Sequence, residues 1–405
     1  MWGQRREDVL HRRPALGEFA TPLLTLDRTA LAHNTAVMSE WARSQGVLLA
    51  PHGKTTMAPA LWRQLLDAGA WGLTLATVWQ AQVARASGVV RILIANAVVD
   101  PIGLAWLSRE LDAHPEVEII VWADAPATVV LMEGVLTDIG ARRPLAVIAE
   151  LGAHGGRTGA RGQERATALA AQISASPRLR LAGVGGYEGA LAHDRSPASL
   201  ARVDAYLDEM VGLHNEVSAR GLYHAHPIVT AGGSAYFDRV SDRLVGSVGT
   251  ATVLVRAGAF QVHDDGFYAG IGPLGRTVPG LALRSAMHAW VRVVSAPESR
   301  LRLFDAGKRD LPFDEGLPVV QGVRGLSAAE TRNALGDSRV SALNDQHGFL
   351  QLGAGADAGA LPVGSVIRLG LSHPCTALDK WRLIPVLDDA HVDDPRVVDF
   401  VDTFF

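Results

Sequence analysis

The sequence predicts an α/β fold, a (β/α)8 TIM-type barrel followed by a C-terminal β domain. Between residues 22 and 270, short apolar runs alternate with amphipathic runs at intervals of roughly 25 to 40 residues, which is typical of parallel βα units. About eight such repeats favour a closed barrel over an open sheet. After about residue 280, short strand-like runs are separated by Gly, Pro and Asp turns, which indicates a β domain without long helices.

The individual elements follow from the period of the apolar residues. Barrel strands are expected at residues 23–26, 48–51, 72–76, 92–96, 118–123, 145–150, 181–185, 228–231 and 251–255. Helices are expected at residues 59–69, 78–88, 164–176 and 197–221. Strands of the β domain are expected at residues 289–295, 300–305, 348–352 and 365–371. These runs predict a barrel domain over 20–275 and a β-rich domain over 276–405, to which residues 1–19 could be joined.

Composition narrows the class of protein. Of 405 residues, 48% are hydrophobic and 20% are charged, enough for a sizeable core. The net charge of -4 argues against nucleic acid or an anionic membrane as the main partner, and no apolar run reaches the length of a membrane span. The arginines near the start precede no apolar run of the kind a secretory signal needs. Cys375 is the single cysteine, so no intrachain disulfide can form, and a soluble cytoplasmic protein is expected.

The segment around Lys54 is the most informative stretch of the chain. His52 and Gly53 precede this lysine and two threonines follow it, between an expected buried strand and an expected helix. At the C-terminal mouth of a parallel strand, an ammonium group costs free energy to bury, whereas a neutral amine can condense with a carbonyl group. The alternative is a surface lysine on a strand-to-helix loop, and it is weakened by the other motifs.

Small-residue loops follow four of the later expected strands. Chemistry in a (β/α)8 barrel gathers at the C-terminal strand ends, so these loops are candidate ligand contacts. Glycines there let the backbone approach a ligand, and successive N–H groups with a hydroxyl can form a phosphate nest. Each loop alone is more often a plain turn, but four in order form a stronger joint signal. In chain order, the candidates are Arg157, Tyr187, Gly232 with Gly233 and Ser234, and Gly258 with Ala259.

A second candidate site lies near the C-terminus, at His373-Pro374-Cys375. On extended backbone, residues two apart point to one face, and imidazole with thiolate is a ligand pair typical of Zn²⁺. Two protein ligands would leave coordination positions open for water and substrate. The alternative is a buried cysteine beside a turn histidine. His347, in the turn 344–348, is a further polar candidate with a similar alternative.

Taken together, these motifs resemble the fold-type III pyridoxal-phosphate (PLP) enzymes, in the D-serine dehydratase and D-threonine aldolase branch related to alanine racemase. The resemblance covers about residues 20–390. It implies a Schiff base between Lys54 and PLP, within a motif that includes His52. It implies that Arg157 reaches the phenolic oxygen side of PLP, that Tyr187 lies beside the pyridine ring, and that His373 and Cys375 bind a metal, expected to be Zn²⁺. It assigns the phosphate of PLP to Gly232, Gly233, Ser234, Gly258 and Ala259.

The resemblance also implies an activity. We expect a metal-assisted dehydratase that converts a D-3-hydroxy amino acid to a 2-oxo acid and ammonia, because Cys375 stands where D-threonine aldolases usually have aspartate. A retro-aldol lyase is the alternative, since both reactions use the same residues. A non-catalytic PLP carrier is disfavoured by the His-Cys pair. A racemase is disfavoured because no tyrosine follows residue 270. Relatives pair head-to-tail, so a homodimer is expected, with a small-molecule D-amino acid as the other partner.

Overall fold

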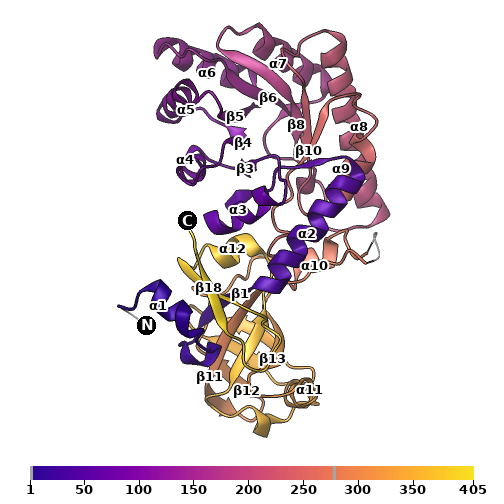
Figure 1. Cartoon of the computed structure of the whole chain (residues 1–405). Helices are drawn as coiled ribbons and strands as arrows, with labels where there is room; N and C mark the ends of the chain where they lie inside the picture. Colours follow the sequence, from indigo (N-terminus) through magenta and orange to yellow (C-terminus); the bar gives the residue numbers. More distant parts are fainter. Residues whose placement is uncertain (1–2, 277–279) are drawn as a thin grey trace.

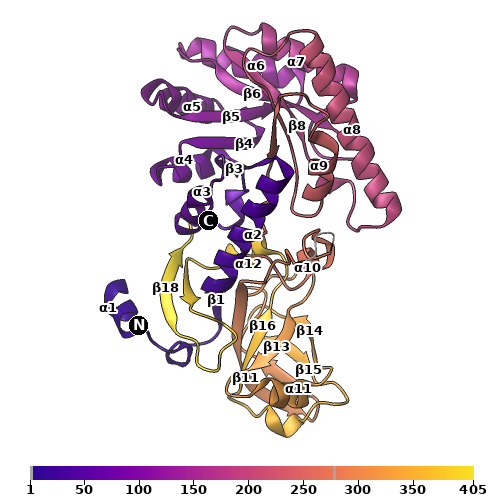
Figure 2. The same ribbon diagram turned by 45° about the vertical axis from the view of Figure 1, so that its right-hand side comes forward.

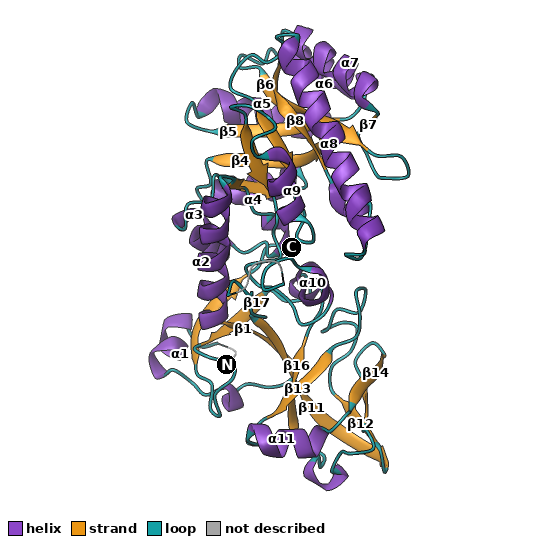
Figure 3. Ribbon diagram, turned by 90° about the vertical axis from the view of Figure 1, so that its right-hand side faces the viewer, coloured by secondary structure: helices purple, strands orange, loops and turns teal. Residues whose placement is uncertain are grey.

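The computed structural model describes residues 3–276 and 280–405. Figure 1 shows two bodies, a helix-covered parallel sheet above and a mostly antiparallel sheet below, and Figures 2 and 3 show the same division after rotation. Short segments, including α10 (Phe267–Ile271) and α12 (Pro374–Leu378), lie between the two bodies. This junction is where the C-terminal part of the chain approaches the mouth of the upper body.

The upper body is a parallel barrel. Its eight-strand ring runs β2 (Leu48–Leu49), β3 (Leu73–Leu75), β4 (Arg91–Ala97), β5 (Glu118–Ala123), β6 (Leu145–Gly152), β8 (Leu179–Gly186), β9 (Ile228–Ala231) and β10 (Thr252–Val255), and β10 pairs with β2. The short β7 (Ala160–Arg161) pairs with β6. Between β2 and β3 the ring is closed by a parallel bridge from His52 to Thr74 and by Thr74 N–H donating to Pro51 O at 2.9 Å. The predicted (β/α)8 barrel is confirmed.

Helices cover the outside of this ring (Figure 1). They are α2 (Arg28–Gln45), α3 (Pro59–Asp67), α4 (Val78–Ala86), α5 (Pro101–Ala113), α6 (Pro126–Asp138), α7 (Gln163–Ala175), α8 (Pro197–Ala219) and α9 (Phe237–Leu244). The first of them, α2, precedes the first barrel strand. It packs beside α9 through the rings of Trp41 and Phe237, whose centroids are 4.7 Å apart. The helix α2, which precedes β2, and the helix α9, which precedes β10, therefore lie side by side on the outside of the ring.

The lower body is a second nine-stranded sheet. Its strands are β1 (Leu23–Asp27), β11 (Met287–Glu298), β12 (Leu301–Phe304), β13 (Val319–Val323), β14 (Arg339–Leu343), β15 (Gly348–Gln351), β16 (Val366–Gly370), β17 (Leu383–Leu387) and β18 (Val397–Asp402). The helix α11 (Ala328–Leu335) and the 3₁₀ helix η4 (Ala358–Ala360) are short insertions. Helices in the described part of this domain are thus short, as expected.

The first expected barrel strand does not belong to the barrel. Residues 23–27 do form β1, but β1 pairs antiparallel with β11 and parallel with β17 in the second sheet. A short apolar run carries no information about its partner strand, which explains the error. The N-terminal segment extends the same domain, because α1 (Arg6–Arg12) packs on β18, and Leu16, in η1 (Leu16–Glu18), donates its N–H to Pro395 O.

The barrel interior is filled by side chains that alternate inward along the strands. Leu93, Ile120, Ile148 and Leu254 belong to this inner cluster and are fully buried. Trp122 caps the cluster, and the guanidinium carbon of Arg256 lies 4.8 Å from the centre of its ring. The barrel is therefore closed below this pair and hollow above it. Among the described helices, none is both long enough and apolar enough to cross a membrane.

Candidate active site

A cavity of about 500 Å³ opens above the Trp122–Arg256 pair, between the C-terminal strand ends and the β domain. All but one of the site residues that the sequence suggested line it. They are His52, Lys54, Arg157, Tyr187, Gly232, Gly233, Ser234, Gly258, Ala259, His373 and Cys375. His347 does not, because it lies at the turn that begins β15 in the second sheet. Residues more than 300 positions apart in sequence thus face one space.

Lys54 lies in η2 (Gly53–Thr55), the 3₁₀ helix that follows β2. Trp62, fully buried on α3, holds this segment by donating its indole N–H to Gly53 O at 3.0 Å. Within residues 3–276 and 280–405, Lys54 makes neither an ion pair nor a hydrogen bond. Its amine is therefore available to a ligand in the cavity.

His52 forms part of the cavity wall and is held as a neutral imidazole. Burial, followed by the nearby positive charges of Lys54 and Arg256, lowers the pKa of His52 well below its ordinary value. A Cβ added to Gly258 would lie 2.5 Å from the Cβ of His52, so only glycine permits this approach of the two loops. The end of β2 and the segment after β10 are therefore in direct contact.

Arg256 is a site residue that the sequence analysis missed. It follows β10 directly, is 3% exposed, and donates hydrogen bonds to Thr230 Oγ1 and Gly186 O, both at 2.6 Å. Burial lowers its pKa, while the carboxylate of Glu188 opposes that effect. An arginine at the end of an apolar strand was the available signal, because a buried charge needs a function or a partner.

Arg157 and Tyr187 form another part of the cavity wall. The guanidinium carbon of Arg157 lies 4.7 Å from the centre of the Tyr187 ring, a cation–π contact. Arg161 shapes the loop that carries Arg157 by donating to Thr158 O at 2.8 Å and to Gly159 O at 2.6 Å. Burial, then the nearby Glu188 carboxylate, raises the pKa of Tyr187, so its hydroxyl stays protonated.

The loop after β9 differs from the predicted phosphate nest. Gly232 and Gly233 donate their N–H groups to the two carboxylate oxygens of Glu188, at 2.9 and 2.7 Å. These two N–H groups are occupied by a neighbouring side chain, which a sequence pattern cannot reveal. The Ser234 hydroxyl accepts the N–H of Ala259 at 3.1 Å, so the loops after β9 and β10 meet at the cavity as expected.

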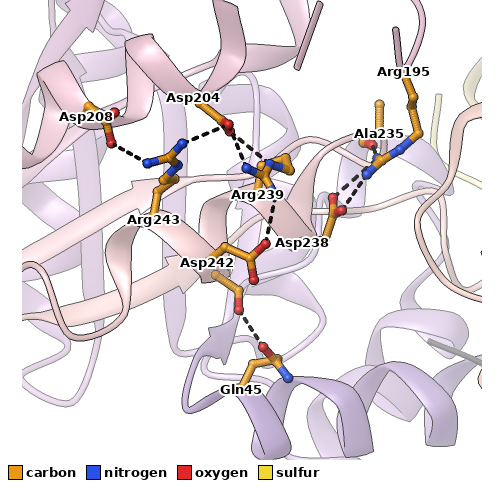
Figure 4. A network of polar contacts seen from close by, with 10 residues as sticks. Gln45, Arg195, Asp204, Asp208, Ala235, Asp238, Arg239, Asp242 and Arg243 are labelled. Atoms are coloured by element: carbon orange, nitrogen blue, oxygen red, sulfur yellow. Dashed lines mark hydrogen bonds and ion pairs between the residues drawn. The ribbon is translucent and has the colours of Figure 1, made fainter. Parts of the chain in front are cut away.

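A network of ion pairs fixes the outer side of this loop (Figure 4). Arg195 donates to Ala235 O at 2.8 Å and pairs with Asp238 at 2.5 Å. To the left of this pair in Figure 4, Asp204 on α8 accepts from Arg239 at 2.6 Å and from Arg243 at 2.9 Å. Bidentate and shared pairs of this kind hold α9 against α8. They thereby hold the loop that begins α9 and contains Ser234.

His373 and Cys375 meet at the cavity, but by a different geometry from the one assumed. The backbone there is not extended: His373 has φ 50° and ψ 84°, and Cys375 lies in the first turn of α12. Pro374 at the first helical position starts this turn. The imidazole and the thiol still contact each other, and α12, which contains Cys375, packs against η2 beside Lys54.

Asp314 supports this pair from the β domain. Its carboxylate lies 2.5 Å from His373 Nδ1 and also accepts the Thr376 hydroxyl at 2.7 Å. The contact with Cys375, and then that with Asp314, raise the pKa of His373 to about 9, although burial opposes them. Burial pushes the pKa of Cys375 upward, yet His373 and Thr55 together bring it below its ordinary value. The carboxylate–histidine arrangement leaves Nε2 for a metal ion.

Tyr268 is another lining residue that the sequence analysis did not identify. Asp264, 1% exposed, accepts the N–H groups of Gly266, Tyr268, Ala269 and His373, and so ties α10 to the metal-pair segment. Tyr268 is the last tyrosine in the sequence, two positions before residue 270. The absence of a later tyrosine therefore does not mean that the cavity lacks a phenol there.

The residues present fit a polar, anionic cofactor and a metal ion. Three buried polar atoms of lining residues have no hydrogen-bond partner among the described residues: His52 Nδ1, Trp122 Nε1 and Arg256 Nε. Orphaned buried groups are costly unless a ligand or water satisfies them. No cluster of three or more His, Cys, Asp or Glu that could hold a metal is found in the described residues. A metal ion at this place would therefore have His373 and Cys375 as its protein ligands.

Two family models match the chain. The alanine racemase N-terminal domain matches residues 26–255, more than half of the sequence. The serine dehydratase domain matches residues 286–387. The first covers the barrel, β10 included, and the second covers the strands β11 to β17 with the His-Cys pair.

Several similar proteins are named as aldolases or dehydratases of D-amino acids. D-threonine aldolase of Arthrobacter sp. is 28% identical over 382 residues, 94% of this chain and 92% of the relative. The crystal structure of D-threonine aldolase from Filomicrobium marinum has a TM-score of 0.80 and 25% identity, covering 96% of each chain. D-threo-3-hydroxyaspartate dehydratase from Delftia sp. HT23 has a TM-score of 0.73 and 20% identity, covering 96% of this chain and 99% of that one. Structures of dehydratase variants altered at a histidine or at a cysteine two positions later are also similar, and the cysteine variant is described as metal-free.

Proposed function

This chain belongs to the family of the alanine racemase N-terminal domain, among the fold-type III PLP enzymes, and we propose that it is a lyase of a 3-hydroxy-D-amino acid. One observation carries the proposal. Lys54, without an ion-pair partner among the described residues, lines the same cavity as the His373–Cys375 pair. A Schiff-base lysine beside a metal pair fits chemistry at both Cα and the 3-hydroxyl of such a substrate.

The chain's own residues suggest how PLP would be held. Lys54 would attach it covalently, and Ser234 with the Gly258–Ala259 segment would face its phosphate. Arg157, Tyr187 and Arg256 would contact its ring, and the Nε of Arg256, which has no partner among the described residues, would be free to donate to it. When bound, PLP supplies a conjugated ring that takes up the electrons left at Cα. Lys54, once released by the substrate amine, would remove the Cα proton.

The metal pair would act at the neighbouring carbon. His373 and Cys375 would hold Zn²⁺, whose Lewis acidity at the 3-hydroxyl eases departure of that oxygen. Asp314 would fix the imidazole through Nδ1, as carboxylates do for zinc-bound histidines. The approach of α12 to η2 would bring this centre next to the Lys54 amine.

Elimination and retro-aldol cleavage would both use these residues, so the two reactions are alternative proposals. Cys375 supports the dehydratase, because the metal-free description of the dehydratase structure belongs to a cysteine variant with the same spacing from a histidine. The aldolase has support of its own, since the most identical relative above is named a D-threonine aldolase. We place the dehydratase first on the metal pair and keep the aldolase as the second candidate.

The test is a product screen over D- and L-3-hydroxy amino acids, with and without chelator. A dehydratase releases a 2-oxo acid and ammonia, whereas an aldolase releases glycine and an aldehyde or a 2-oxo acid. A non-catalytic carrier would bind PLP and release neither set. Turnover of the L-isomers in preference to the D-isomers would contradict the proposal.

We also propose a cytoplasmic homodimer. Large apolar side chains are exposed at the barrel mouth, where Ile102 begins α5 and Trp79 begins α4, at 79% and 61% exposure. The two helix starts are neighbours, because a Cβ on Gly103 would touch Val78 at 3.1 Å. Exposed apolar side chains gathered beside a site favour a partner surface there.

A further inference from the structure

Glu188 is a buried carboxylate that the proposed chemistry does not use. It lies in η3 (Glu188–Ala190) directly after Tyr187 and is 0% exposed. Its two oxygens accept the N–H groups of Gly232 and Gly233, at 2.9 and 2.7 Å. Burial of a carboxylate costs free energy unless its oxygens accept hydrogen bonds. The two glycine N–H groups provide these hydrogen bonds.

Glu188 joins two strand-end loops, and Ser234 joins a third to them. The Glu188 carboxylate links the end of β8 to the loop after β9, and the ring of Tyr187 packs on the same loop, since a Cβ on Gly233 would lie 2.7 Å from it. Ser234 next carries the link to β10 by accepting the Ala259 N–H at 3.1 Å. The wall beside Tyr187 and the loop of Ser234 therefore behave as one unit.

We propose that Glu188 is the positioning residue of the cofactor site. It holds the Gly232–Gly233 turn in shape before the cofactor arrives, so that Ser234 and the Tyr187 ring are already placed. This inference rests on the proposed PLP function. A pre-formed site binds its ligand more tightly, because no conformational entropy is lost in ordering the loop when the ligand binds.

The charge and the reach of the carboxylate both matter. Glutamate supplies two acceptors to two N–H donors, and the nearby guanidinium of Arg256 feels its negative charge. Glu188→Gln keeps the size but turns one acceptor into an N–H₂ donor that faces an N–H group. Glu188→Asp keeps the charge but shortens the side chain by one methylene, so it cannot reach both glycines equally.

The experiment measures the PLP dissociation constant of the full-length apoprotein by titration, with the thermal midpoint of the apoprotein as a second readout. We expect Glu188→Gln to raise the dissociation constant about ten- to hundredfold, the effect of one lost and one repulsive contact in a buried site. Glu188→Asp should raise it less. Turnover at saturating PLP should fall less than affinity does.

Asp27 provides a matched control. It is 1% exposed in the second sheet and accepts the N–H groups of Ala30 and Ala390 at 2.8 and 2.6 Å, but it does not line the cavity. Asp27→Asn should lower the thermal midpoint and leave the PLP dissociation constant within about twofold of wild type, because the lost contact is remote.

The outcomes separate the two claims. If wild type binds PLP, and Glu188→Gln and Glu188→Asp bind it with wild-type affinity, Glu188 is only a stabilising residue and the inference fails. If Glu188→Gln does not fold, the Glu188→Asp dissociation constant decides alone. If the wild-type protein itself binds no PLP, the proposed function fails together with the inference.

Discussion

Lys54 concentrates the proposed chemistry in one residue. The sequence contains only three lysines, Lys54, Lys308 and Lys380, and only the first lines the cavity. Reduction of the PLP-loaded protein with borohydride should therefore label one peptide, which mass spectrometry can assign.

We expect Lys54→Ala to lose both the absorption band of lysine-bound PLP and all turnover, because the covalent anchor and the Cα base are lost together. Lys308→Ala should retain both, since Lys308 stacks on Phe313 in the β domain. Near-normal turnover of Lys54→Ala, measured under the same conditions, would contradict the assignment of Lys54 as the PLP anchor and the Cα base.

The metal pair can be separated from the cofactor by chelation. We expect chelator to abolish product release while the band of lysine-bound PLP persists, because the contacts proposed for PLP do not include His373 or Cys375. Cys375→Ala should behave alike, and added Zn²⁺ should restore only the chelated wild type. Metal analysis of active, freshly purified protein checks the premise: a protein that turns over without bound transition metal contradicts it.

At the scale of the elements, the strand-end loops work because their backbones touch. Gly258→Ala would place a methyl group 2.5 Å from His52 Cβ and 2.8 Å from His52 O, so two backbone segments must separate. We expect a lower thermal midpoint and weaker PLP binding. Gly134→Ala is the control, since that α6 position has nothing within 4 Å and should gain up to about 1 kcal/mol from helix propensity. Equal effects of the two changes on PLP affinity would refute the contact argument.

The strand β11 carries a pH-sensitive histidine. Burial, then the charges of Arg368 and His391, lower the pKa of His288 to about 3, and its Nε2 has no partner among the described residues. His288 is therefore neutral in the folded state at pH values where it is protonated in the unfolded chain, below about pH 6.5. The free energy of unfolding consequently falls as the pH drops below that value.

His288→Gln removes this titration. Between pH 7 and pH 5, wild type should lose about 2 kcal/mol more unfolding free energy than the variant does, from linkage alone. Urea unfolding at the two pH values measures the difference. Parallel losses in the two proteins would mean that His288 is protonated without cost in the folded state.

At the scale of the whole molecule, the exposed mouth predicts association. We expect light scattering to give twice the chain mass for wild type and a lower mass for Ile102→Asp, because a charge there opposes burial in an interface. Ile139→Asp is a matched control, because Ile139 caps the C-terminal end of α6, away from the barrel mouth, and its side chain is 44% exposed. A monomeric wild type at micromolar concentration would overturn the homodimer.

Much of the architecture was predictable because local pattern decides it. The expected strands at residues 118–123 and 228–231 coincide with β5 and β9, and Pro59 and Pro197 mark the starts of α3 and α8 as helix-entry prolines do. The second sheet was less predictable. Its strands β13, β14, β17 and β18 gave no separate signal, and β1 was assigned to the wrong sheet.

The candidate site divides in the same way. Lys54 and the glycine loops were visible because they follow apolar strands directly, and strand ends of a barrel converge. The partners that set their chemistry were not visible: Glu188 at Gly232, Asp314 at His373 and Tyr268 at the mouth. Each comes from a different part of the chain, and spacing in sequence carries no information on which distant side chain arrives.

By itself the sequence determined that a barrel forms, that Lys54 stands at its mouth, and that a histidine and a cysteine lie near the C-terminus, because period and residue type are local properties. Only the tertiary structure decided that these groups share one cavity, that α12 rather than extended backbone presents Cys375, and that a carboxylate occupies the N–H groups of the predicted phosphate loop. Those outcomes depend on contacts between distant segments, which are fixed when buried polar groups find partners as the two sheets pack around the cavity.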